Sequence, residues 1–106
     1  MSHICPPDAL PRLSEALWSR ATAVVARHEG LTKESVLRPR GLQARRARHV
    51  AAYLVSTGAG VSMRELARVA GVRRYTLQEA CARIEALRDD PRVDRRLARL
   101  EKEIVV

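Results

Sequence analysis

Apolar residues recur every three or four positions along most of this chain, and that period is typical of helices that bury one face. The pattern predicts a helix over residues 8–29, ended by Gly30. It also predicts a basic loop followed by a second long helix, and this loop and helix span residues 38–56. Their apolar faces are expected to hold Leu13, Leu17, Ala21, Val24 and Val25 in the first helix, and Leu42, Ala47, Val50, Ala51 and Leu54 in the second.

Local signals divide the first half of the chain further. Residues 1–7 lack periodicity and contain two prolines, so we expect a flexible tail there, with Asp8 as a helix cap. Thr32 is expected to start a short helical turn that runs to residue 37, before Pro39 breaks it. Residues 56–60 contain two glycines and are expected to form a loop.

Residues 62–88 predict a short helix, a turn and a longer helix. Ser62 and Glu65 have the spacing of a capping box, and Gly71 can adopt the left-handed conformation that ends a helix. An apolar seam between the two helices is expected to hold Leu66, Ala67, Val69, Leu77, Ala80, Cys81, Ile84 and Leu87. Asp90 and Pro91 then predict the start of a final helix over 91–105.

Composition favours packed helices over sheets. The 106 residues include only three aromatic ones (Trp18, Tyr53 and Tyr75), so the core must be built mainly from Leu, Val, Ile and Ala. The chain length fits one small domain. We therefore predict an all-α fold, a small bundle of five to six helices in a single domain over residues 8–106, containing a helix-turn-helix.

The net charge of +8 is concentrated in the middle of the chain. Residues 31–60 hold six basic and one acidic residue, and residues 61–88 hold six and three, whereas the two ends are neutral. A basic zone rich in arginine favours nucleic acid as a partner. A solvated surface or an acidic protein partner remains an alternative explanation.

The basic zone falls on the predicted helix-turn-helix. Such a motif places the start of its second helix in the major groove of DNA, where Arg74, Gln78 and Tyr75 would meet base edges. Arg73 lies at the same helix start, and Thr76 suits a phosphate or a thymine methyl group, unless Thr76 caps the helix together with Glu79. An ordinary αα-hairpin would explain the seam but not this cluster.

A second basic group precedes and opens the long helix. Arg38 and Arg40 flank a proline in a segment that could enter a minor groove, where negative potential favours arginine. The other candidates for contact with DNA are Arg45, Arg46, Arg48 and Arg64. Arginines at a helix start oppose the helix dipole, and an anionic ligand would remove that cost. Each of them could also be an ordinary solvated charge.

Other functional classes find little support. The cysteines, Cys5 and Cys81, form no metal-binding or redox pair, and the histidines share no ligand spacing, so neither metal nor cofactor is expected. Acidic residues are expected in ion pairs such as Glu85 with Arg88 rather than in a catalytic pair. We expect a non-enzymatic protein. With neither a long apolar run nor a signal peptide in the sequence, we expect it in the cytoplasm, at the nucleoid, without membrane contact.

Several segments together resemble a known family. The stretches beginning at Leu31, Arg38, Arg46, Ser62 and Ala80 are similar to the C-terminal DNA-binding domain of the bacterial replication initiator DnaA, over about residue 20 to the end. The resemblance implies a helical bundle with a helix-turn-helix and a basic loop. It also implies that Arg40 enters the minor groove and that Arg46 and Arg48 contact the DNA backbone.

The chain departs from that family at the bases it would read. The family's Gly-Gly-Arg-Asp-His-Ser/Thr-Thr-Val signature becomes a shorter segment with Arg73 and Arg74 at the positions of the base-reading Asp and His, and Tyr75 at that of a small hydroxyl residue. An arginine, which can donate to guanine, replaces a residue that can accept from cytosine. The chain is therefore expected to recognise a DNA sequence other than the one that the family binds. No GxxxxGK[ST] loop occurs, so no ATPase is expected.

These features give two functional hypotheses. The first is a sequence-specific binder of double-stranded DNA that regulates transcription, most simply as an activator. It would work with a sigma-like factor or RNA polymerase, as in the DnaA-like activators of gene transfer agent clusters that the chain resembles. On DNA it would bind as a homodimer or together with that partner. The second is a protein-interaction module or replication modulator, for which Leu13, Leu17 and Trp18 on the first helix would offer a surface.

Overall fold

The computed structural model describes the backbone of residues 9–105 and the side chains of residues 13–105. All regular structure in this part of the chain is helical, which confirms the predicted all-α bundle of five to six helices. The predicted tail over 1–7, with Cys5, and the Asp8 cap lie outside the described residues. The helices are α1 (Ala9–Glu29), α2 (Lys33–Leu37), α3 (Leu42–Ala59), α4 (Met63–Ala70), α5 (Arg74–Leu87) and α6 (Pro91–Val105).

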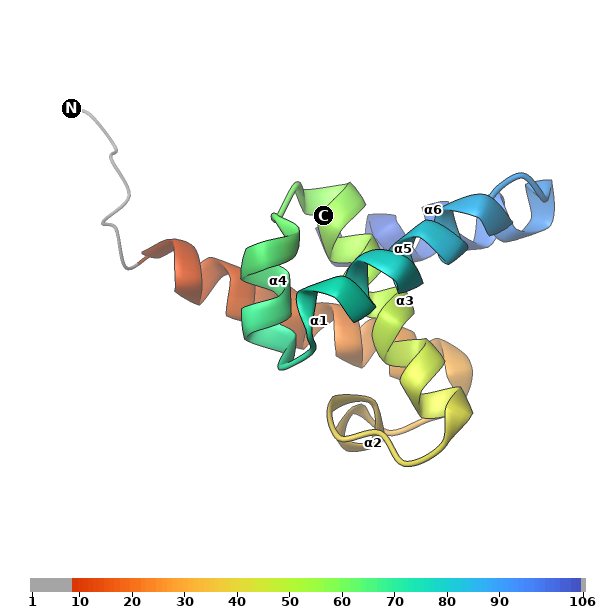
Figure 1. The fold of residues 1–106 in the computed structure, drawn as a ribbon. Helices are drawn as coiled ribbons and strands as arrows, with labels where there is room; N and C mark the ends of the chain where they lie inside the picture. Colours follow the sequence, from red (N-terminus) through yellow and green to blue (C-terminus); the bar gives the residue numbers. More distant parts are fainter. Residues whose placement is uncertain (1–8, 106) are drawn as a thin grey trace.

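Helix α3 forms the centre of the fold and contacts each of the other five helices. In Figure 1 it passes between α4 and α5 at the front and α1 behind them. Residues 51–55 are five consecutive buried positions, so this part of α3 is enclosed on every side. Four of the buried α3 residues are alanines, and their small side chains let the neighbouring helices approach the α3 backbone closely.

The other helices bury one face each, as their periodicity predicts. Val25 on α1, Leu66 on α4 and Leu77 on α5 are each 0% exposed. Helix α6 buries Leu97, Leu100 and Ile104 and is also tied to α1 by ion pairs of Arg96 with Glu29 and of Glu103 with Arg27 and His28. The core of the described residues is thus mainly aliphatic, and the aromatic residues Trp18 and Tyr53 are also buried in it.

The predicted end of the long helix is wrong. Residues 56–59 are helical, and α3 ends at Gly60, whose φ of 69° is left-handed. The hydroxyl of Thr57 donates to the carbonyl oxygen of Tyr53 and to a carboxylate oxygen of Glu101, at 3.0 and 3.1 Å. A Cβ atom on Gly58 would lie 2.8 Å from side-chain atoms of Glu101. Close packing on α6 therefore extends the helix through residues of weak helix propensity.

Four predicted apolar positions are also placed differently. Leu13, Leu42 and Leu87 are 57%, 58% and 59% exposed. Trp18 is only 5% exposed, so it belongs to the core and does not offer a surface to a partner. Leu17 is half-buried and lines a shallow pocket together with Leu13 and Val61. Of the surface that the sequence suggested on the first helix, only Leu13 and Leu17 therefore remain accessible.

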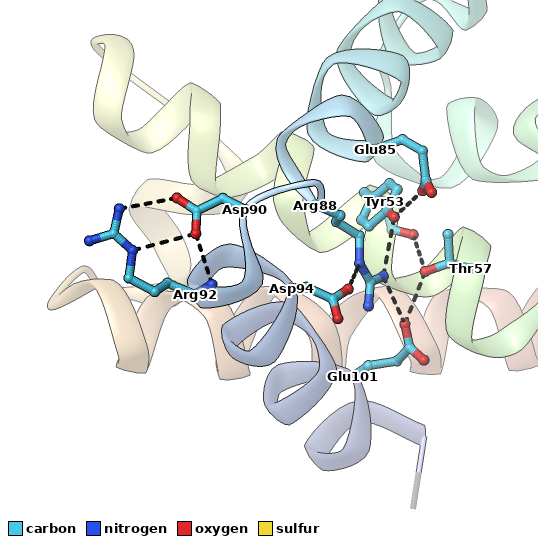
Figure 2. Close-up of polar contacts among 8 residues, drawn as sticks. All are labelled: Tyr53, Thr57, Glu85, Arg88, Asp90, Arg92, Asp94 and Glu101. Atoms are coloured by element: carbon cyan, nitrogen blue, oxygen red, sulfur yellow. Dashed lines mark hydrogen bonds and ion pairs between the residues drawn. The ribbon is translucent and has the colours of Figure 1, made fainter.

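A polar cluster joins α3, α5 and α6 around Arg88 (Figure 2). The Arg88 guanidinium donates to the Asp94 carboxylate at 2.6 Å and to the Tyr53 hydroxyl at 3.2 Å, and lies 4.0 Å from Glu101. The Tyr53 hydroxyl in turn donates to the Glu85 carboxylate. Hydrogen bonds to Tyr53 and Asp94 raise the pKa of Arg88. The expected pair of Glu85 with Arg88 is wrong, because each binds Tyr53 instead.

Replacing a fully buried leucine at the centre should cost far more than replacing an exposed one. We expect Leu66→Ala to lower the free energy of unfolding by about 2–5 kcal/mol, because it removes buried methyl groups and leaves a cavity. Leu42→Ala, the matched control at a 58% exposed position, should stay within about 0.5 kcal/mol of the original chain. Urea denaturation followed by circular dichroism measures both. Equal losses would contradict this assignment of the core.

The Arg88 cluster should also stabilise the fold. We expect Arg88→Met to lower the free energy of unfolding by about 1–3 kcal/mol, because the Tyr53 hydroxyl and the Asp94 carboxylate lose a charged donor. Arg92→Met is the control, since the Arg92 side chain is 84% exposed and, among the described residues, pairs only with nearby Asp90. The same denaturation experiment compares the two, and an equal effect of both variants would show that the cluster is unimportant for stability.

Candidate nucleic-acid interface

A three-residue turn joins α4 to α5 and fixes the direction in which α5 begins. The Ser62 hydroxyl accepts a hydrogen bond from the backbone N–H of Glu65 at 3.2 Å, which confirms Ser62 as the cap of α4. The other half of the predicted capping box is not formed, because the Glu65 carboxylate accepts from Arg68 instead. Gly71 ends α4 with a φ of 69°, and the N–H groups of residues 71 and 72 both donate to the carbonyl of Ala67. Because Leu77 is fully buried, the opposite side of the first turns of α5 faces solvent.

The residues proposed to contact DNA at the start of α5 all have solvent-exposed side chains. Arg73, Arg74, Tyr75, Thr76 and Gln78 are exposed, and Tyr75 is 71% exposed. Helix α5 has Arg73 at its N-cap position, without a side-chain hydrogen bond, so the alternative that Thr76 caps the helix is wrong. Arg74 and Gln78 are four residues apart and therefore lie on one face of α5.

Glu79 is a member of this surface that the sequence did not single out. Its carboxylate accepts a hydrogen bond from the Tyr75 hydroxyl at 3.2 Å, one helical turn away. The contact restricts the tyrosine ring to one side of α5. The signal in the sequence is the spacing of four residues between Tyr75 and Glu79, whereas Glu79 was expected only as a possible capping partner of Thr76, three residues before it.

The second basic group lies at the start of α3 and in the segment before it. Gly41, with a φ of 100°, turns the chain into α3 and leaves the helix without a side-chain cap. Arg40, Arg45 and Arg46 are exposed, and so is Arg64 on α4. Arg38 is exposed but lies 3.6 Å from the Glu34 carboxylate.

Arg48 differs from the other candidates. It is half-buried, and its Nε atom is buried without a hydrogen-bond partner. Burial, followed by the charge of Arg45, lowers the pKa of Arg48. The expected contact of Arg48 with the DNA backbone stays a prediction, and among the candidate arginines Arg48 is the one that is half-buried.

Most arginines of the candidate surface lack a carboxylate partner, whereas those elsewhere in the described chain are divided. Arg27, Arg68, Arg88, Arg92 and Arg96 each lie within 4.0 Å of a carboxylate, and Arg20, Arg83, Arg95 and Arg99 have no such partner among the described residues. Of the candidate arginines, only Arg38 has such a partner among the described residues. The unpaired candidates are Arg40, Arg45, Arg46, Arg48, Arg64, Arg73 and Arg74.

The same regions contain the helix starts that lack a side-chain cap. In α2, α4 and α6, the side chains of Thr32, Ser62 and Asp90 accept hydrogen bonds from backbone N–H groups of the first turn. At the starts of α3 and α5 no side chain does so. Free N–H groups and the positive end of the helix dipole therefore add to the arginine charges at both places.

His49 is a further residue that the sequence did not assign. It is half-buried on α3, and burial followed by the charges of Arg48, Arg83 and Arg45 lowers its pKa below the usual 6.5. Arg83 comes from α5, so the positive potential spans both helices. Close to neutral pH the imidazole is therefore uncharged and can accept or donate a hydrogen bond.

Neither the structure nor the comparisons with known proteins identify a cofactor or a family for this chain. In the part of the chain that the structure describes, no three His, Cys, Asp or Glu side chains are grouped as a metal ion would require. None of the described helices is both long and apolar enough to cross a lipid bilayer. No family model, curated protein or solved structure matches this chain. The similarity to the DnaA domain thus stays a prediction from the residues quoted above.

The lowered pKa of His49 predicts how stability depends on pH. The unfolded chain binds a proton at this imidazole near pH 6.5, whereas the folded protein does so only at lower pH. The unfolded state therefore binds more protons in this window, and stability falls as the pH drops below about 6.5. We expect His49→Gln to lose less stability between pH 7 and pH 5 than the original chain does, in urea denaturation series. A variant profile as steep as the original would contradict the assignment.

Proposed function

We propose that this chain is a sequence-specific binder of double-stranded DNA that regulates transcription. In this proposal α4 and α5 act as a helix-turn-helix, the start of α5 enters the major groove, and the segment around Arg40 reaches the adjacent minor groove. The protein needs no cofactor for this activity and catalyses no reaction. Association with the nucleoid in the cytoplasm follows from the same proposal.

One observation carries the proposal: exposed arginines without carboxylate partners are grouped at the starts of α3 and α5, and neither of these starts has a side-chain cap. Unpaired like charges repel one another and oppose the helix dipoles, so this arrangement costs stability in the free protein. Phosphate groups would remove that cost by accepting hydrogen bonds from the arginines and from the free N–H groups. A duplex presents phosphates on both sides of the groove that α5 would enter.

Base recognition would come from side chains one turn apart on α5. Arg74 can donate two hydrogen bonds to guanine, and Gln78 can form a pair of hydrogen bonds with adenine. The Glu79 carboxylate could accept from the amino group of cytosine, provided that its hydrogen bond with Tyr75 opens or is shared. The pairs of Arg74 with guanine and of Gln78 with adenine would each discriminate by about 1–3 kcal/mol against a wrong base.

The regulatory role rests on the resemblance to stand-alone DnaA-like activators. A single recognition helix buries limited surface, so tight binding calls for two copies on adjacent half-sites or for a protein partner on the same DNA. A sigma-like factor or RNA polymerase itself is the partner that fits an activator.

The test is selection from a pool of randomised duplexes, followed by fluorescence anisotropy with the enriched sequence at several salt concentrations. We expect one sequence to be enriched and its affinity to fall steeply with salt, because bound phosphates release counterions. Arg74→Ala should reduce the preference for one base pair by about 5- to 150-fold. Arg45→Ala should weaken binding to all duplexes alike and lower the salt slope by about one.

Arg92→Ala is the matched control, since it removes an equal charge from an exposed residue that already pairs with Asp90. It should leave affinity and salt slope nearly unchanged. If no sequence is enriched, or if Arg92→Ala weakens binding as much as Arg45→Ala does, the proposed interface is wrong.

A further inference from the structure

A groove of about 660 Å³ lies between α3 and α5, beyond the first turns of α5. Its floor is apolar and is formed by Val50, Ala80, Ile84 and Leu87. Two arginines lie at its edges, Arg46 on α3 and Arg83 on α5. Both arginines are exposed, and neither has a carboxylate within 4.0 Å among the described residues.

The groove combines exposed apolar surface with unbalanced positive charge. Leu87 is 59% exposed although it belongs to an otherwise buried seam, and Val50 and Ile84 are only partly covered. The effect of Arg83, Arg48 and Arg45 on His49, which also lines the groove, shows that the positive potential extends into it. An exposed leucine and uncompensated arginines on one surface are typical of a binding site for a partner that supplies both apolar and acidic groups.

We propose that the α3–α5 groove binds an amphipathic helix of an acidic protein partner. Leucine or isoleucine side chains spaced three or four residues apart would cover the floor from Val50 to Leu87. Glutamate or aspartate residues at the edges of that helix would pair with Arg46 and Arg83. Positions 80 to 87 extend over about 10 Å of α5, which matches roughly two turns of a bound helix.

The floor argues against DNA as the occupant. A phosphodiester backbone is charged and would leave Leu87 and Ile84 without apolar contacts, whereas aliphatic side chains would remove both from water. Leu87 is also 13 residues beyond Arg74, about 20 Å along the helix, so it is distant from the residues proposed to read bases. A second copy of this chain fits poorly, because two molecules with a net charge of +8 repel each other.

This inference does not depend on DNA binding, although the two are compatible. Arg83 and Leu87 belong to the groove and were not assigned to the DNA interface, whereas Arg74 belongs only to that interface. Arg46 is shared, since it is both a candidate phosphate contact and an edge of the groove. Variants of Arg83, Leu87 and Arg74 can therefore separate the two activities.

The probe is a synthetic 16-residue helical peptide with leucine at positions 2, 5, 9 and 12, glutamate at the positions that flank these leucines on the helix surface, and alanine elsewhere. A peptide of the same composition in scrambled order is its control. Titration into isotope-labelled protein is followed by NMR, and fluorescence anisotropy gives the affinity. We expect shifted signals from the groove residues, and an affinity at least tenfold higher for the ordered peptide than for the scrambled one.

Variants of the protein make the test specific. Leu87→Ser and Arg83→Glu should each weaken peptide binding at least tenfold, and both replace exposed side chains, so the fold should be retained as checked by circular dichroism. Leu13→Ser is the matched control at an equally exposed leucine, 57% against 59%. It should leave the affinity for the peptide unchanged, as should Arg74→Ala.

Three results would overturn the inference. The first is equal binding of the ordered and the scrambled peptide, which would show attraction by charge alone. The second is a set of shifts confined to the start of α5. The third is that Arg83→Glu and Leu87→Ser leave peptide binding intact but weaken binding to a DNA duplex, which would assign the groove to nucleic acid. If Arg74→Ala loses DNA binding but keeps peptide binding, the result supports both proposals.

Discussion

The enclosure of α3 by the other helices is the constraint on which the rest of the structure depends. Its middle residues are buried on every side, and alanines on its surface allow the close approach that this requires. Because α5 packs directly on α3, the position of α3 determines where the exposed start of α5 projects. The candidate surface and the groove both arise from this pair of helices: the surface lies where their N-terminal turns are uncapped, and the groove where their apolar faces are incompletely covered.

Most of the fold could be predicted from the sequence, because it depends on local signals. The period of apolar residues gives the helices, and Thr32, Ser62, Gly71 and Asp90 mark where helices begin or end. The end of α3 could not be predicted in this way. Its last turn is held by contacts with Glu101 and Val105, some 45 residues later in the chain, and such contacts override weak local propensity. The exposure of Leu42 and Leu87 could not be predicted either, because it depends on how helices that are far apart in sequence pack together.

The candidate site divides in the same manner. Exposure of Tyr75 and Gln78 could be expected, because both lie on the side of α5 away from the buried Leu77. The lack of carboxylate partners at Arg73 and Arg74 could not, since ion pairs such as that of Arg96 with Glu29 join helices that are remote in sequence. The partial burial of Arg48 and the effect of Arg83 on His49 also depend on how α3 meets its neighbours, and no spacing along the chain contains that information.

The place of α6 in the core has a consequence for how the protein is made. Leu97, Leu100 and Ile104 cover α3 and α1, so during synthesis these two helices remain incompletely covered until α6 has left the ribosomal exit tunnel. During that interval the apolar side of α3 is exposed, and such surface is prone to aggregation. Detachment of α6 from a folded molecule would uncover the same residues.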